Sequence, residues 1–159
     1  MGCAAFAAVA LLACGGGGKK TDDTMGGGGG GTMETGKKPL IDRLGGKAGI
    51  TKVVDVFVAK VGDDNRINGF FANPTGGNLD HLKAMLVDQI CDAASGGAVC
   101  QYTGKSMEET HKGMNIKQEH FDALVEDLVA AMKEVGVGDA EQQEILGVLG
   151  PLQPKIVEQ

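Results

Sequence analysis

His111 is the residue with the clearest capacity for chemistry, because it places one imidazole between two hydrophobic helical segments. The stretch that carries it runs from Tyr102 to Val125, with Met107 before it and Phe121 after it. A neutral imidazole at the end of a short helix, in an apolar pocket, is the usual proximal ligand of haem iron. A lone histidine is also common on surfaces and in satisfied cores, so its neighbours must decide between these roles.

The elements that position His111 are expected to be helices, because apolar residues recur at intervals of three and four and no strand-like alternation occurs. The first predicted helix is short, at 40–44, and is stopped by Gly45 and Gly46. The second has an apolar stripe from Ile50 to Val61, and the third runs from about Asn78 to Cys91. The fourth carries Phe121 to Met132 and is stopped at Gly136, and a fifth helix follows it. The last helix is predicted to begin at Asp139, with a capping box to Gln142, and Pro151 should kink or end it.

Several motifs in this order resemble the group 1 truncated haemoglobins. They are Tyr102-Thr103-Gly104, Met107, His111, Gly113 and Ile116, the double glycines at 45–46 and 96–97, the pair Phe70-Phe71, and the ending Gly-Val-Leu-Gly-Pro-Leu at 147–152. The resemblance covers residues 40–157. It implies an all-α, two-over-two globin fold and a b-type haem, and the chain has no Cys-x-x-Cys-His motif for covalent haem attachment.

The resemblance also assigns roles around the haem. It implies His111 as the proximal iron ligand and Phe71 rather than Phe70 as the aromatic that stacks on the haem. A haem also needs a partner for its propionates, and Lys105, on the loop leading to His111, is the candidate. The remaining haem-contacting residues implied are Phe57, Leu82, Met85 and Met107. For the Phe pair plain core packing stays open as an alternative, and Lys83 and Lys112 are further basic residues near the expected pocket.

The distal side departs from the family pattern. Relatives often place Tyr and Gln over the iron, where this chain has Val58 and Leu82. That departure puts slow oxygen release and nitric oxide dioxygenation in doubt, because both need a hydrogen-bond donor there. His81 precedes Leu82 and is a candidate for a sixth iron ligand, with an exposed helix position as its alternative. His120 is expected at the surface.

These features predict a haem protein that reversibly binds O2, NO or CO, with enzymatic activity left open and the electron donor unidentified. Two alternatives remain: a six-coordinate haem protein for electron transfer or redox sensing, and a haem-free helical adaptor. The net charge of −6, without a run of Lys or Arg, gives no basis for nucleic-acid binding. We expect a monomer.

The N-terminal region differs in composition from the rest of the chain. Residues 1–14 form an apolar run that ends in Leu-Leu-Ala-Cys and resembles a bacterial lipobox, which predicts a signal peptide and lipidation of Cys14. An ordinary secretory signal or a start lying upstream are the alternatives. Residues 15–38, with eleven glycines, are predicted to be a flexible linker to a domain at 39–159. The protein would then be anchored by lipid to the membrane of the bacterial cell envelope.

Cys91 and Cys100 are the cysteines that the mature domain would keep. They lie nine residues apart across a glycine-rich reversal, and outside the cytoplasm they are good candidates for a disulfide. Closing that loop would stabilise the fold by roughly 2.5–3 kcal/mol in the chain-entropy description. A zinc site with these two thiols and a histidine is the alternative, although it lacks a fourth ligand and a Cys-x-x-Cys spacing.

Overall fold

The computed structural model describes residues 37–72 and 78–158, and the predicted signal peptide, Cys14 and most of the predicted glycine-rich linker lie outside these ranges. Throughout the described residues the regular structure is helical, which confirms the predicted all-α class. The helices are α1 Leu40–Arg43, α2 Gly46–Asp63, α3 Asn68–Phe71, α4 Leu79–Ser95, α5 Met107–His111, α6 Gln118–Glu134, α7 Asp139–Leu149 and the 3₁₀ helix η1 Gly150–Lys155.

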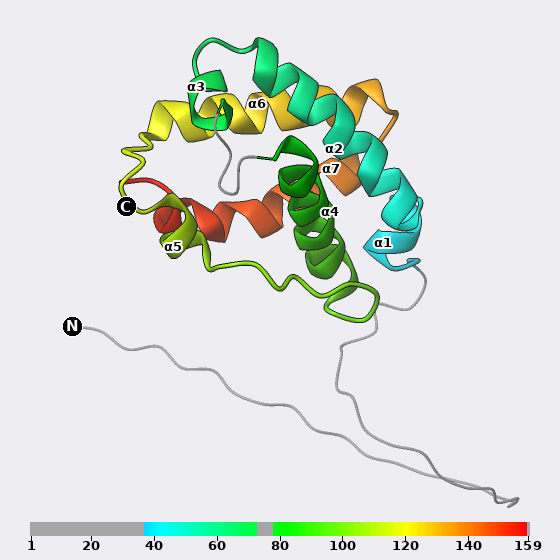
Figure 1. The fold of residues 1–159 in the computed structure, drawn as a ribbon. Helices are drawn as coiled ribbons and strands as arrows, with labels where there is room; N and C mark the ends of the chain where they lie inside the picture. The colour runs from blue at the N-terminus through cyan, green and yellow to red at the C-terminus, as the bar shows by residue number, and fades with distance from the viewer. Residues whose placement is uncertain (1–36, 73–77, 159) are drawn as a thin grey trace, which may run out of the picture. The chain divides into compact units, whose positions relative to one another are not determined.

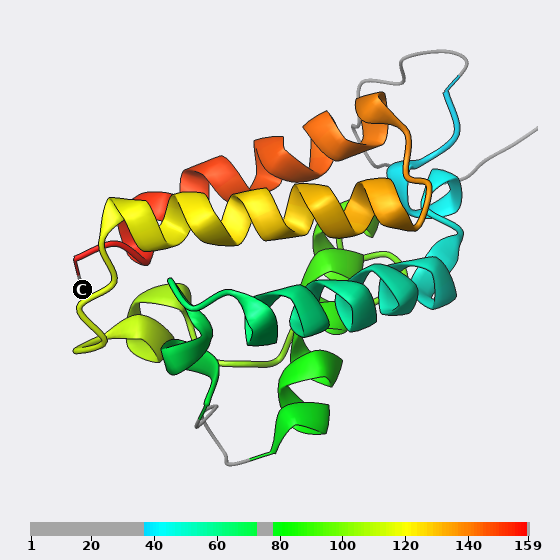
Figure 2. The ribbon, with the colours of Figure 1, turned by 90° about the horizontal axis from the view of Figure 1, so that it is seen from above.

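Four long helices form two pairs that cross. Helix α2 packs against α4 on one side and α6 on the other, and α7 runs back antiparallel to α6 (Figures 1 and 2). Figure 1 shows α4 running across the direction of α6 and α7. This is the two-over-two arrangement that the sequence predicted. The short helix α5 lies outside the pairs and packs against η1.

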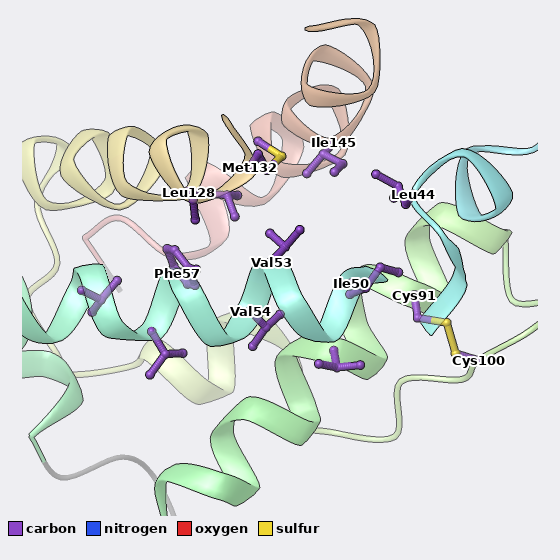
Figure 3. Close-up of a cluster of buried hydrophobic side chains, with 14 of the residues drawn as sticks. Leu44, Ile50, Val53, Val54, Phe57, Cys91, Cys100, Leu128, Met132 and Ile145 are labelled. Atoms are coloured by element: carbon purple, nitrogen blue, oxygen red, sulfur yellow. A yellow bond between two sulfur atoms is a disulfide. The ribbon is translucent and has the colours of Figure 1, made fainter. Parts of the chain in front are cut away.

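The predicted stripe of α2 forms the centre of the core. Its apolar side chains are buried between the two pairs, and Figure 3 shows Val53 and Phe57 pointing toward Leu128 and Met132 of α6. Residues of α2 that share this burial are Ile50, Val53, Val54, Phe57, Val58 and Val61. Fully burying a side chain of this size contributes roughly 1.5–3 kcal/mol. The stripe therefore fixes where α4 can pack.

One helix boundary and one helix cap differ from the prediction. Helix α4 continues four residues beyond Cys91 to Ser95, and it ends at Gly96, whose φ of +60° is typical of a glycine C-cap. Helix α7 has Gly138 at its N-cap, so Asp139 is its first helical residue and forms no capping box. The Gln142 amide instead donates to the backbone oxygen of Val137, at 2.7 Å.

The end of α7 follows the prediction. The α-helix stops at Leu149 and the chain continues as η1, which contains Pro151 and Pro154. A proline in a helix interior removes one backbone hydrogen bond and clashes with the preceding turn. None of the helices within 37–72 and 78–158 is long and apolar enough to cross a membrane.

Candidate functional site

Helix α5 owes its first turn to a reciprocal cap. The Ser106 hydroxyl oxygen accepts from the backbone N–H of Glu109 at 3.2 Å, and the Glu109 carboxylate accepts from the backbone N–H of Ser106 at 3.2 Å. The Ser106 hydroxyl also donates to the Glu109 carboxylate at 3.0 Å, and this bond, together with the one from the Ser106 backbone N–H, lowers the pKa of Glu109. The cap gives a helix of five residues a defined start, and His111 is its last residue.

The ring of His111 is held in one tautomer. Its Nδ1 lies 2.7 Å from the backbone oxygen of Met107, one turn earlier. Because a carbonyl oxygen only accepts hydrogen bonds, Nδ1 carries the proton and Nε2 keeps its lone pair. Within the described part of the chain, Nε2 forms no hydrogen bond or ion pair. A half-buried imidazole with this tautomer is the donor that haem iron requires.

The buried apolar residues divide into two clusters. The main cluster is the core around α2, and the smaller one is built on Ile116, Phe121 and Ile156, with Met107 packed against it. Phe70 packs against both clusters. The short helix that carries His111 therefore packs on the smaller cluster through Met107.

One stripe of α4 is turned toward α5. The amide nitrogen of Gln89 lies 3.4 Å from the sulfur of Met107 and donates to it, which identifies the facing side. Leu82, Met85 and Leu86 precede Gln89 by three to seven residues and so lie on the same side of the helix. All three are half-buried. The sequence prediction that Leu82 and Met85 face the pocket is consistent with this register.

A cavity of about 300 Å³ adjoins this region. Its walls come from α4, the segment before α5, α5 itself and η1, and they consist of Gln89, Tyr102, Lys105, Ser106, Met107, Glu108, Leu152 and Lys155. Burial raises the pKa of the Tyr102 hydroxyl, which donates to the backbone oxygen of Lys105 at 3.1 Å. Lys105 was predicted near the haem edge, whereas Lys155 was missed because it is distant in sequence.

The other residues predicted for the site occupy varied positions. Phe57 and Val58 are buried in the main cluster, and Phe71 packs against the same cluster. His81 is exposed on α4, so its role as a sixth iron ligand stays a prediction. Lys83 forms an ion pair with Asp55 at 2.9 Å, which engages its ammonium group away from the site.

Cys91 and Cys100 are joined in a disulfide, with their Cα atoms 5.6 Å apart (Figure 3). The thiolates needed for the alternative zinc site are therefore not available. Across the residues that the structure describes, no group of three or more His, Cys, Asp or Glu side chains could hold a metal ion.

His120 has a role that the sequence interpretation missed. It was expected at the surface, but its Nδ1 accepts from the backbone N–H of Lys117 at 3.1 Å and its ring centre lies 4.9 Å from that of Phe70. His120 thus caps α6 and supports the aromatic that touches both clusters. Its position three residues after Lys117, at the start of a helix, was the available signal.

Comparison with known proteins identifies the family. Residues 39–158 match the bacterial-like globins. The chain is 39% identical over 104 residues to a group 1 truncated hemoglobin of Tetrahymena thermophila, covering 65% of this chain and 82% of the relative. It is 36% identical over 117 residues to one from Mycolicibacterium paratuberculosis, covering 74% of this chain and 82% of that relative.

The crystal structure of the Tetrahymena pyriformis truncated hemoglobin, Fe(III) form, superposes with a TM-score of 0.70 at 34% identity, covering 77% of this chain and all of that one. The chain therefore belongs to the bacterial-like globin family, among its group 1 truncated haemoglobins, and its cofactor is haem b.

Proposed function

We propose that the protein binds haem b between α4 and α5, with Nε2 of His111 as the iron ligand, and that it reversibly binds diatomic gases. The observation that carries this proposal is the hydrogen bond from His111 Nδ1 to the Met107 oxygen, which leaves Nε2 as the free donor atom. A haem iron with one protein ligand offers its remaining position to O2, NO or CO.

The chain's own residues supply the surroundings of that chemistry. Leu82, Met85 and Leu86 on α4 would line the haem site and limit the access of water to it, and Phe70 packs against both apolar clusters. The Gln89 amide donates to Met107, so it is engaged by the proximal helix. A gas molecule on the α4 side would meet mainly hydrocarbon, which favours NO and CO over O2, because O2 gains most from a nearby donor.

We also propose that the globin domain works at the cell envelope, tethered through lipid on Cys14. The disulfide between Cys91 and Cys100 supports an oxidising compartment, since such bonds are rare in reducing ones. Mass spectrometry of the protein made in a bacterial host tests this. The expected product begins at Cys14 and carries acyl chains, and an unmodified N-terminus in a soluble fraction would contradict the anchor.

An absorption spectrum of the protein after haem addition tests the main proposal. A Soret band with gas-dependent shifts is expected in the wild type, and His111→Ala should lose stable haem uptake. Because His111→Gly leaves room for free imidazole, added imidazole should restore the band if the variant is folded. Normal haem content in His111→Ala would refute the assignment, and no Soret band in the wild type would leave the haem-free adaptor.

His81→Ala is the matched histidine variant, since His81 is exposed on α4. Sharp, split visible bands in the unliganded ferrous wild type, replaced by one broad band in His81→Ala, would support His81 as a reversible sixth ligand. A broad band already present in the wild type would exclude that role. In either case His81→Ala should keep its haem.

A further inference from the structure

The position of His111 depends on more than its own helix. Helix α5 has five residues, and a helix this short is not stable by itself in water. It packs against η1 on one side. What holds the chain just before α5 must therefore set where the imidazole points.

The first attachment before α5 is the disulfide. Cys91 belongs to α4 and is fully buried, and Cys100 begins the non-helical segment that leads to Met107. Both cysteines are members of the main core cluster. Figure 3 shows the sulfur–sulfur bond at one end of the side chains drawn from that cluster. The bond therefore attaches the start of the proximal segment, residues 100–111, to the main core cluster.

Two hydrogen bonds continue the attachment toward His111. The backbone N–H of Tyr102 donates to Oδ2 of Asp92 at 3.2 Å, and the amide of Gln89 donates to the sulfur of Met107 at 3.4 Å. Asp92 and Gln89 are three residues apart on α4, so they lie on neighbouring positions of one face. The same face thus holds the proximal segment at its beginning and again at the first residue of α5.

We infer that Cys91, Cys100 and Asp92 are positioning residues for His111. They hold the proximal segment against α4, and through it they set how tightly the protein keeps its haem. This inference rests on the proposed haem-binding function. The disulfide also restricts the unfolded chain, so its removal lowers the stability of the whole domain, and the test must separate that loss from the effect on the proximal segment.

The test measures the rate at which haem moves from the loaded protein to excess apomyoglobin. The double variant Cys91→Ala/Cys100→Ala should lose haem at least about tenfold faster, the lower end of what removing a ligand-orienting partner costs a metal site. The control is Val61→Ala, which opens a cavity in the core eleven residues beyond Ile50 on α2. Urea unfolding of both loaded variants gives the loss of free energy of unfolding in each. Relative to that loss, the rate of haem release should rise much more in the cysteine variant than in Val61→Ala.

Asp92 provides a second test that does not depend on the cysteines. Asp92→Asn keeps an oxygen that can accept from the Tyr102 amide and should retain haem like the wild type. Asp92→Ala removes the acceptor and should accelerate haem loss by a smaller factor than the double variant.

Three results would overturn the inference. They are equal haem loss in the cysteine variant and the wild type, haem loss that only follows stability as in Val61→Ala, and identical behaviour of Asp92→Asn and Asp92→Ala. A wild type that takes up no haem would instead refute the proposed function.

Discussion

Gly104 gives a sharp test of the packing between α4 and the proximal segment. A Cβ added there would lie 2.6 Å from the terminal carbon of Met85 and closer still to the hydroxyl end of Tyr102. Real Cβ atoms do not approach other atoms so closely, so one or both side chains must move. The methionine is flexible, but the Tyr102 ring is stiff and its hydroxyl is hydrogen-bonded to the backbone oxygen of Lys105.

The expected cost of Gly104→Ala follows from these contacts. Inserting one carbon into a packed site typically costs about 1–3 kcal/mol. Losing the Tyr102 hydrogen bond accounts for roughly 0.5–1.5 kcal/mol of that range. Gly62→Ala is the matched control, because nothing lies within 4 Å of its Cβ position and Gly62 is helical. There the same change should stabilise the protein by about 0.5 kcal/mol, since glycine is the more costly residue in a helix.

Urea unfolding followed by far-ultraviolet circular dichroism measures both variants. In the double variant Gly104→Ala/Met85→Ala one clash disappears, so its destabilisation should fall short of the sum of the single variants by about 0.5 kcal/mol or more. If Gly104→Ala is as stable as Gly62→Ala, the close approach between α4 and the proximal segment does not exist. Additive single variants would mean that Met85 does not contribute to it.

Three further predictions concern the scaffold. Oδ2 of Asp127 is buried and has no hydrogen-bond partner among residues 37–72 and 78–158, and burial raises the pKa of this carboxyl. Its charge therefore costs stability above that pKa, so Asp127→Asn should raise the free energy of unfolding by about 1 kcal/mol at pH 7, and the gain should vanish at low pH. Hydrogen bonds from Arg43 lower the pKa values of Glu141 and Glu144. The stabilisation from these ion pairs is therefore present above the ordinary pKa of a glutamate and is lost as the pH falls through the lowered values. Thermal melts should show Arg43→Ala as destabilising at pH 7 but no longer in strong acid. Gly136 has a φ of +83°, so Gly136→Ala should cost about 1 kcal/mol in the same melts.

The parts of the fold that depend on local pattern could be predicted from the sequence. The stripe of α2 and the stops at Gly45 and Gly136 are visible because burial on one face and a positive φ each select a residue type at a fixed place. His111 was located for the same reason, since its neighbours form a continuous motif. Each of these features is contained within one helix or one turn.

The features that the sequence interpretation missed depend on contacts between distant segments. Gln142 had a capping pattern, but the competing bond to the Val137 oxygen could be recognised only after the turn between α6 and α7 was known. Lys155 reaches the cavity because η1 packs against α5, forty-four residues after His111.

The two ends of α4 are held differently, and this difference bears on His81. Gln89, Cys91 and Asp92 attach the C-terminal half of α4 to the proximal segment. The first turn has a local cap, in which the Asn78 side chain accepts from the N–H of Asp80 at 2.8 Å, and His81 in that turn is exposed. Since successive residues on a helix are turned by about 100°, His81 can reach the inner face taken by Leu82 only if this turn rotates or unwinds. Ligation by His81 would therefore move the first turn of α4 alone and leave the attachments of His111 in place.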